Sequence, residues 1–464
     1  MTSDLDPATN DAHVLECGEF LARHPDVRAA DILICDPGGV LRGKRLRRHE
    51  LEAVYRNGRM LSSSIMSLSF TGEDVEETGL VWDVGDADCL ARPVPGTLVR
   101  VPWSRYPLAQ LLLMFDAEEG MPAATADPRL VLNRVVAAMR ADGLFPDVAA
   151  ELEFYLFDKD NGQDGRPVPA QPPGAARRKR QTDVYSVAEL VDYAPFLETL
   201  YDCCRMQGIP AETAISEYAP GQLEITLAHR GDALRAMDEA VMYKRAVKGV
   251  AADLGMRASF MAKPFSNQAG SGFHFHASVT DGQGRNLFAS DDPLSHPLLR
   301  HAIGGLLHTM HDAFAIFAPN GNSYRRFRHN SYAPVLPTWG YNNRTVSVRI
   351  PRGPANACHV EHRVCGADAN PYLVAAAVLA GMHYGIRNRI DPGPAVAGDG
   401  YLADGAPLPT TWLHAIDTMG RSRFIAEYLG EGFRKVFTAI KRKEAETFLG
   451  EVTALDYDWY LRDA

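Results

Sequence analysis

Acidic, imidazole and guanidinium side chains recur two residues apart within apolar stretches of the chain. The pairs are Glu151 and Glu153 in AELEFYLFD, His274 and His276 in GFHFH, and Glu361 and Arg363 in VEHRV. Residues i and i+2 of a β-strand project from the same face of a sheet. Each pair is therefore predicted to present its two polar groups side by side, with apolar neighbours on the opposite face.

Two further acids, Glu217 and Glu224 in SEYAPGQLE, extend this set. Collecting so many charges on one sheet face costs folding free energy unless something neutralises them. Carboxylates with occasional imidazoles are the ligands that Mg²⁺ or Mn²⁺ accept. A single acidic pair is more often a solvated edge, and a single histidine pair is more often structural. Their joint occurrence in one chain favours a site for two or more divalent ions.

Arginines are concentrated in two segments that follow these acids, residues 322–329 (NSYRRFRH) and 342–351 (NNRTVSVRIP). The candidates there are Arg325, Arg326, Arg344 and Arg349. Guanidinium groups bind phosphate and carboxylate groups through paired hydrogen bonds. Acids for metals together with arginines for anions indicate phosphoryl transfer to an acidic substrate. The segment GGVLRGK at 38–44 has P-loop glycine spacing, but Arg45 stands where Ser or Thr should follow, and the context is a hairpin.

The elements that must position these residues alternate between strands and helices. Strands are predicted at 150–158, 221–228 and 272–279, and helices at 127–143, 187–207, 231–254 and 295–316. Residues 1–110 form a smaller unit that opens with a hairpin around the Pro-Gly-Gly turn at 37–39. Residues 111–464 form a larger second domain, so we expect two domains.

Composition restricts the class of protein further. The 464 residues carry a formal net charge of −10, which argues against a broad nucleic-acid-binding surface. The seven cysteines form no CxxC pair and their number is odd, which argues against a disulfide framework. Free cysteines indicate a reducing compartment such as the cytoplasm. The longest apolar run, within 372–379, is shorter than the roughly 20 residues that cross a bilayer, and the acidic N-terminus is no secretory signal. We expect a cytoplasmic protein without membrane or nucleic-acid partners.

Read in order, the chemical segments resemble the successive motifs of the class I glutamine synthetases. The matching segments are ELEFYLFD, SEYAPGQLE, KPFSNQAGSGFHFH, NSYRRF, NNRTVSVRIP and VEHRVCGADANPYL. The resemblance extends from DILICDPGGVLRGKR to the C-terminal helices. It implies an α+β fold with a small N-terminal β-grasp domain and a catalytic domain built on an antiparallel sheet with helices. It also implies a homo-oligomer, a dodecamer of two hexameric rings, in which the neighbouring N-terminal domain completes each active site.

The resemblance also implies a role for each matching residue, with glutamate and ATP as substrates and Mg²⁺ or Mn²⁺ as cofactor. One ion is held by Glu153, Glu217 and Glu224. The second is held by Glu151, His274 and Glu361. ATP is contacted by His276 and Arg349, and glutamate by Gly270, Arg326 and Arg363. Arg344 steadies the transferred phosphoryl group, and Glu217 helps to accept a proton from the incoming amine.

The chain differs from the family motifs at several positions, and two of these differences affect the predicted binding of the amine. Tyr332 in SYAP occupies the place of a glutamate that binds ammonium, and Leu61 in MLSSSI aligns with an aspartate of the neighbouring subunit. We predict that these two residues line an amine pocket suited to the carbon chain of an organic amine. Ala269 replaces an asparagine of the glutamate-side loop, and His359 replaces an arginine of the ATP site.

The segments AGSG and PTWGYNNR (337–344) are similar to those of the γ-glutamylpolyamine synthetase branch, whose substrates are putrescine and related amines. Monoamines such as ethanolamine, alkylamines or aniline are the alternative, followed by ammonia and by a relative that has lost its activity. For a diamine, Asp74, Glu76 and Glu77 are candidates to bind the distal ammonium group.

Overall fold

The computed structural model describes residues 7–117, 122–176, 178, 181–462 and 464, with side chains described from residue 14 onward. The helices are α1 Pro7–Arg23, α2 Leu51–Asn57, α3 Pro128–Ala141, α4 Val187–Asp192, α5 Ala194–Gln207, α6 Ala233–Asp253, α7 Pro297–Thr309, α8 Phe314–Phe317, α9 Pro371–Asn388, α10 Trp412–Arg421, α11 Arg423–Ile425, α12 Glu431–Gly450 and α13 Ala454–Tyr460. The strands are β1 Ala29–Cys35, β2 Leu41–Arg47, β3 Arg59–Ser62, β4 Asp88–Pro93, β5 Val99–Arg100, β6 Leu108–Phe115, β7 Phe145–Asp158, β8 Ala211–Ser216, β9 Gln222–Arg230, β10 Met256–Ser259, β11 Phe273–Thr280, β12 Trp339–Tyr341, β13 Val348–Ile350 and β14 Val360–His362.

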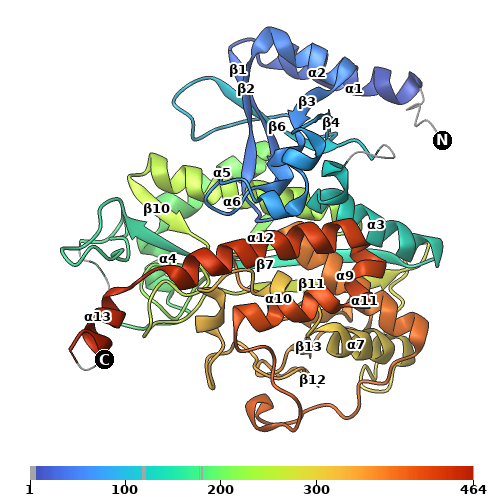
Figure 1. The fold of residues 1–464 in the computed structure, drawn as a ribbon, viewed down its shortest axis with the longest axis vertical. Helices are drawn as coiled ribbons and strands as arrows, with labels where there is room; N and C mark the ends of the chain where they lie inside the picture. Colours follow the sequence, from blue (N-terminus) through green and yellow to red (C-terminus); the bar gives the residue numbers. More distant parts are fainter. Residues whose placement is uncertain (1–6, 118–121, 177, 179–180, 463) are drawn as a thin grey trace.

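The N-terminal unit is built around a sheet with the strand order β2-β1-β6-β4-β3, and β5 pairs with β6. Strands β1 and β6 are parallel, whereas the other neighbours are antiparallel. Helices α1 and α2 lie at the end of this unit far from the rest of the chain (Figure 1). The GGVLRGK segment spans the β1–β2 turn and the start of β2, so its interpretation as a hairpin is confirmed.

The larger unit is organised around a second sheet with the order β12-β13-β14-β11-β7-β9-β8, and β10 pairs with β7. All pairs except β12–β13 are antiparallel. Helices α3, α6, α7 and α9 pack with this sheet around a large apolar core. The predicted α+β class, with an antiparallel catalytic sheet and helices, is confirmed.

The local sequence explains where helix α3 begins and why the chain leaves the helix between α4 and α5. Asp127 caps α3 by accepting backbone hydrogen bonds from Arg129 and Leu130, and Pro128 occupies the first helical position. The single helix predicted over 187–207 is wrong, because the chain leaves the helix at Tyr193 before α5 begins and carries Pro195 in the first turn of α5. Proline suits a helix start and disfavours a helix interior.

Strand β6 crosses residue 110, since it spans Leu108–Phe115 within the N-terminal sheet. A boundary at residue 110 would cut this strand. We propose that the two domains meet after β6, between residues 115 and 125.

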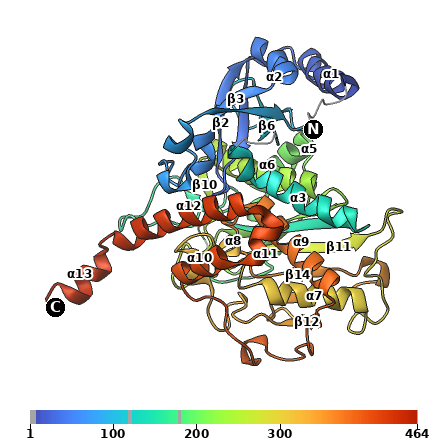
Figure 2. The same cartoon turned by 45° about the vertical axis from the view of Figure 1, so that its right-hand side comes forward.

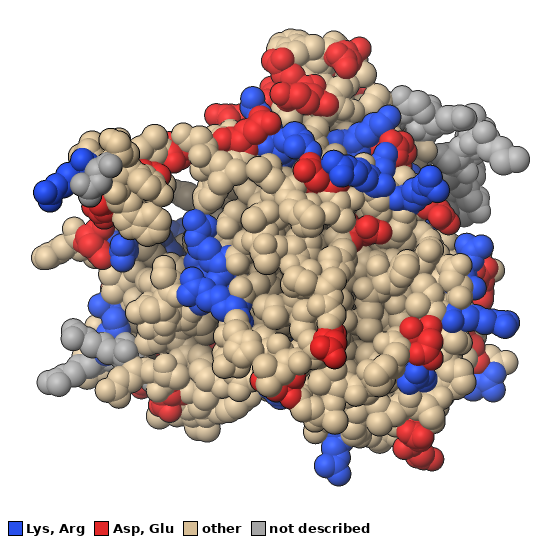
Figure 3. Space-filling view, turned by 60° about the horizontal axis from the view of Figure 1, so that its bottom comes forward, with Lys and Arg blue, Asp and Glu red and all other residues tan. Residues whose placement is uncertain are grey.

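The distribution of surface charge and the lengths of the helices are relevant to the prediction that the protein has no nucleic-acid or membrane partner. Lys and Arg side chains are interspersed with Asp and Glu over the face shown in Figure 3. Among the described residues, none of the helices is both long and apolar enough to span a bilayer. The C-terminal helix α13 extends away from the body of the molecule (Figure 2).

Candidate active site

The strand register of the large sheet brings the predicted acids and histidines together. Glu151 of β7 faces His274 of β11, and Glu153 of β7 faces Glu224 of β9. On the other side of β11, His276 faces Glu361 of β14. Four strands thus contribute to one polar face, and the two-residue periodicity sets the spacing along each strand.

Three acids form one end of this face, which we call the oxygen end: Glu153, Glu217 and Glu224. One carboxylate oxygen of each lies within 4.8 Å of the others. Burial and the nearby Glu153 raise the pKa of Glu217 to about 8, and burial with the neighbouring acids raises that of Glu224. Burial and like charges disfavour the ionised forms of these acids, and a bound cation would relieve that repulsion.

The middle of the face holds Glu151, His274 and Glu361. His274 Nδ1 lies 3.2 Å from Glu151 Oε2 and 3.8 Å from Glu361 Oε1. Glu361 is 1% exposed and accepts hydrogen bonds from Arg349 Nη1 at 2.7 Å and from Arg363 Nη1. Although burial opposes ionisation, these arginines and the nearby histidines lower the pKa of Glu361 to about 2.

The ligand sets overlap in the middle of the face. Besides the oxygen end, the atoms of Glu151, Glu224 and His274 and those of Glu151, His276 and Glu361 lie within 4.8 Å of one another. All six residues expected to bind metals therefore line one continuous face. His276, expected at ATP, also lies within reach of the metal ligands. Oxygen-rich sets with one imidazole fit divalent metal ions.

The residues expected to bind glutamate form a second cluster next to the oxygen end. Arg326 is buried and donates from Nη1 to the carbonyl of Val364 at 2.8 Å and from Nη2 to the carbonyl of Arg363 at 3.4 Å. A Cβ on Gly270 would lie 2.5 Å from Arg326 Cγ, so the backbone passes too close for any larger residue. Gly270, Arg326 and Arg363 are thus brought together.

Two buried guanidinium groups have unused donors. Nε of Arg349 and Nε of Arg363 are both buried without a hydrogen-bond partner among the described residues. Buried donors normally find acceptors, and an anionic ligand would supply them. Arg344 is exposed and donates from Nη1 to Tyr185 Oη at 3.2 Å, while its charge favours the ionised form of Glu217.

The predicted amine-pocket residues have different surroundings. Tyr332 is 50% exposed, has a positive φ of 57°, and its ring lies 5.9 Å from that of Tyr218, the residue after Glu217. Leu61 is 1% exposed and packs in the N-terminal core, so this burial gives no support to its predicted place in an amine pocket. The alternation along β3 turns Met60 outward and Leu61 inward.

Some neighbours of the site were missed from the sequence. Gln222 donates from Nε2 to Gly270 O at 2.9 Å and to Glu153 Oε2 at 3.3 Å, which joins the glutamate cluster to the oxygen end. Its position two residues before Glu224 on β9 was an available signal. His229 was also missed, and no signal revealed it, because a bulge in β9 alters the alternation.

A cavity of about 1010 Å³ lies apart from this face, between the β1–β2 turn, α6 and α12. Lys244, Trp103, Phe260 and Trp412 line it, as does Asp74. None of the residues predicted to bind metal, ATP or glutamate contributes to it. Within one chain, Asp74 is therefore placed at this cavity and not at the acidic face, which leaves it without support as an anchor for a distal ammonium group.

Comparisons with known proteins agree with the geometry. Residues 125–460 match the family described as the catalytic domain of glutamine synthetase. The chain is 38% identical to the γ-glutamylputrescine synthetase of Escherichia coli over 98% of this chain and 96% of that protein. It is 31% identical to a γ-glutamylethanolamide synthetase of Streptomyces coelicolor, covering 94% and 92% of the two chains. A solved structure of a GmaS/ADP complex superposes with a TM-score of 0.82 at 27% identity, covering 95% and 98% of the chains.

Proposed function

We propose that this chain, which belongs to the glutamine synthetase family, is an ATP-dependent ligase that forms γ-glutamyl amides. Glutamate and an organic primary amine are its substrates, and ATP is the co-substrate. Putrescine or a related polyamine is the preferred amine, in line with the named activity of the 38% identical relative. A monoamine ligase is the alternative, in line with the relatives named for ethanolamide and isopropylamine.

The metal ligands are proposed as two sets. Glu153, Glu217 and Glu224 bind one divalent ion. Glu151, His274 and Glu361 bind the second, since His274 Nδ1 lies 3.2 Å from Glu151 Oε2 and 3.8 Å from Glu361 Oε1. Bound Mg²⁺ or Mn²⁺ supplies Lewis-acid stabilisation of the negative charge on the phosphates. The overlap of the ligand sets supports this assignment, and the raised pKa of Glu217 supports cation binding at the oxygen end.

The arginines bind and orient the two anionic substrates. We assign Arg349 and His276 to the ATP phosphates, and Arg326, Arg363 and the Gly270 backbone to glutamate. The unused Nε donors of Arg349 and Arg363 support this assignment, because phosphate or carboxylate oxygens would satisfy them.

The reaction proceeds in two balanced steps. The γ-carboxylate of glutamate attacks the γ-phosphorus of ATP, so that the bond to ADP breaks and γ-glutamyl phosphate forms. The amine nitrogen then attacks the activated carbonyl carbon, inorganic phosphate leaves, and Glu217 accepts the proton that the amine loses. Arg344 stabilises the charge on the phosphoryl group during both steps.

The single observation that carries the amine preference is the Tyr218–Tyr332 pair beside Glu217. Aromatic rings here favour contact with the carbon chain of an amine and provide no charge to hold a bare ammonium ion. Each buried CH₂ group contributes ~0.8 kcal/mol, so a four-carbon chain gains about 3 kcal/mol, or about a hundredfold in kcat/KM.

The test measures kcat/KM for putrescine, ethanolamine, isopropylamine, aniline and ammonium with one preparation. We expect putrescine, with four carbons, to exceed ammonium by about a hundredfold, and amines with shorter carbon chains to exceed it by less. Tyr332→Glu should shift the preference toward ammonium by about tenfold or more, because it restores a negative charge. Tyr106→Glu, at an exposed tyrosine of the N-terminal unit, is the matched control. A wild type that prefers ammonium, or an unchanged ranking in Tyr332→Glu, would contradict this amine preference.

We further propose that the protein assembles as a dodecamer of two hexameric rings. Support comes from the C-terminal segment, where α12 and α13 expose a run of large apolar side chains: Phe448, Leu449, Val452, Leu455, Tyr457, Trp459, Tyr460 and Leu461. Exposed apolar surface of this kind marks protein contacts. Light scattering that finds a fully active species of 50.9 kDa would rule the assembly out.

A further inference from the structure

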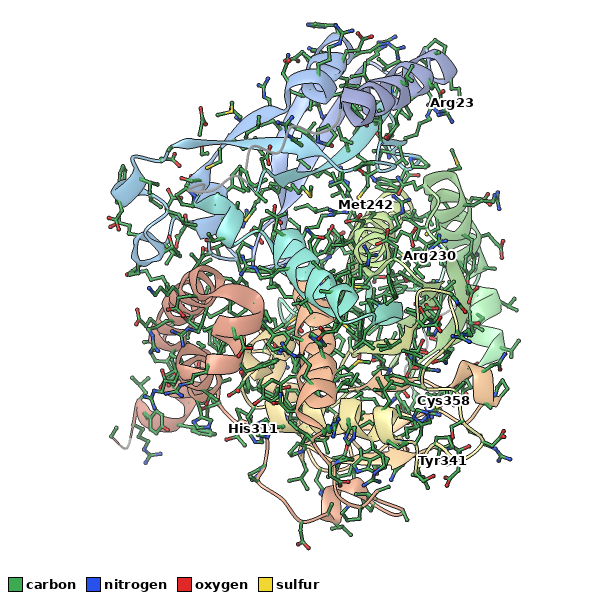
Figure 4. All side chains as sticks on the ribbon, turned by 90° about the vertical axis from the view of Figure 1, so that its right-hand side faces the viewer. Arg23, Arg230, Met242, His311, Tyr341 and Cys358 are labelled. Atoms are coloured by element: carbon green, nitrogen blue, oxygen red, sulfur yellow. The ribbon has the colours of Figure 1, made fainter. Side chains whose placement is uncertain are left out.

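Three histidines from separate segments meet at the opposite end of the polar sheet face, which we call the nitrogen end. They are His229 near the end of β9, His276 in β11 and His359 directly before β14. One ring nitrogen of each lies within 4.8 Å of the others. The ring centroids are 5.1 to 6.1 Å apart. Figure 4 places the sequence neighbours Arg230 and Cys358 on the same side of the molecule.

A β-bulge brings His229 to this face. Ala150 of β7 pairs with Leu227, but Val148 pairs with Arg230, so β9 contains one extra residue at this point. A bulge re-aims the side chains that follow it. His229 therefore lies on the same face of the sheet as Glu224. Without the bulge, regular alternation would place it on the opposite face.

The ring of His359 is oriented by the backbone. Its Nδ1 lies 2.7 Å from the carbonyl oxygen of Ala357, and a carbonyl can only accept a hydrogen bond. The proton is thus on Nδ1, and Nε2 carries a lone pair that can accept a hydrogen bond or bind a metal. That Nε2 lies 3.0 Å from His276 Nδ1. This separation is that of a hydrogen bond between the two rings. A tetrahedral ion with Zn–N bonds of about 2.0–2.1 Å would replace that hydrogen bond and hold the two nitrogens about 3.3 Å apart.

The other two rings also have oxygen atoms behind them. His276 Nε2 lies 3.3 Å from Glu151 Oε1, and His229 Nδ1 lies 3.6 Å from Asp147 Oδ1. Asp147 Oδ1 is buried and has no hydrogen-bond partner among the described residues. Histidines that bind metals commonly have a carboxylate or carbonyl behind the ring, which fixes its orientation and increases its basicity. The ring of His359 is fixed by a hydrogen bond to such an oxygen, whereas His276 and His229 have a carboxylate nearby without one.

We propose that His229, His276 and His359 bind a third divalent cation, Zn²⁺, separate from the two ions assigned to the acids. Three imidazoles suit Zn²⁺ and similar transition metals, whereas Mg²⁺ prefers oxygen ligands. Three protein ligands leave a fourth tetrahedral position for water or a ligand oxygen. His276 is also assigned to the ATP phosphates, so the zinc site and the proposed nucleotide site share this residue, and zinc binding is measured in the absence of ATP.

The test measures zinc binding to the full-length protein, without ATP or amine. The protein is stripped with EDTA, dialysed into excess Mg²⁺ to fill the acidic sites, and titrated with Zn²⁺ by calorimetry. We expect one zinc ion per chain, bound at least about tenfold more weakly in His229→Gln and in His359→Gln. Replacing zinc by Co²⁺ should give the intense visible absorption of a four-coordinate nitrogen site, which both variants lose.

His414→Gln, at an exposed histidine of α10, is the matched control and should bind zinc like the wild type. Circular dichroism checks the fold of each variant, and because His229 is itself exposed, His229→Gln decides the outcome if His359→Gln does not fold. Equal zinc affinity in the wild type and His229→Gln would overturn the proposal. So would zinc binding that is lost in Glu153→Gln but kept in the histidine variants, since the ion would then occupy the acids.

Discussion

The oxygen end and the nitrogen end of the large sheet both take a ligand from β9, but the ligands differ in chemistry. Glu153 and Glu224 come from β7 and β9, and His229 comes from the far end of β9. The ligand type changes from carboxylate to imidazole along one face. Because divalent metals discriminate between oxygen and nitrogen, one sheet can offer sites for different ions within a short distance.

Burial also acts differently along this face. At the oxygen end, burial and like charges raise the pKa values of Glu217 and Glu224. Toward the nitrogen end, the histidines and arginines outweigh burial and lower the pKa values of Glu151 and Glu361. We therefore expect the acids of the oxygen end to need an added cation, whereas Glu151 and Glu361 already have cationic or imidazole partners within the chain.

The largest expected effect is that of removing a ligand at the oxygen end. Glu153→Ala should lower kcat by roughly 10²–10³-fold or more, because the charge of the transferred phosphoryl group loses its stabilisation. Glu198→Ala, at an exposed acid of α5, is the matched control and should leave kcat unchanged. His229→Gln should cost less than Glu153→Ala. If the two variants lost the same factor in kcat, the oxygen end and the nitrogen end would not differ in their contribution to catalysis.

A smaller effect is expected from the middle of the face. Arg349→Met removes a 2.7 Å ion pair with Glu361 and a donor that we assign to the ATP phosphates. Hydrogen bonds to charged groups contribute about 1.5–3 kcal/mol, so KM for ATP should rise about 10- to 100-fold. Arg352→Met, at an exposed arginine without an ion pair in the described residues, is the control. An unchanged KM for ATP would remove Arg349 from the nucleotide site.

The acidic and histidine pairs could be predicted from the sequence because their spacing is local. Residues two apart in a strand share a face, so Glu151 and Glu153 had to project together, as did His274 and His276. Which strands lie next to each other is a long-range property, and here the family resemblance supplied what periodicity could not. The α+β class followed from the alternation of strand and helix patterns together with that resemblance.

The nitrogen end and the amine pocket were less accessible to prediction. His229 reaches the site only through the extra residue in β9, and a bulge leaves no periodic signal. Leu61 was assigned by alignment, but its burial depends on which face of β3 meets the N-terminal core. A shift of one residue in a strand exchanges inside for outside, so a loose alignment cannot place a pocket residue there.

The smallest expected effect is a change in the thermal stability of the metal-free protein with pH. Glu217 has an ordinary pKa of 4.5 in the unfolded chain and a pKa of about 8 in the folded one. Between these values the folded state binds more protons than the unfolded state, so stability falls as pH rises. The contribution of Glu217 is complete below about 4.5 and is lost as pH passes through about 8. Glu361, with a lowered pKa of about 2, contributes in the opposite sense only below about 4.5.

Asp127, whose pKa burial raises to about 6, contributes to the decline in the lower part of this window, so the Glu217→Gln variant isolates the share of the oxygen end. The Tm of EDTA-treated protein should fall from about pH 5 to about pH 8.5, and Mg²⁺ should raise Tm more at the higher pH. Glu217→Gln should flatten the decline, because the amide does not titrate, whereas Glu198→Gln should leave it unchanged. If Mg²⁺ raises Tm equally at both pH values, or if Glu217→Gln keeps the full slope, the repulsion among buried acids is not what distinguishes this end from the other. A flattened slope would instead tie the cation requirement directly to the Glu217 carboxylate.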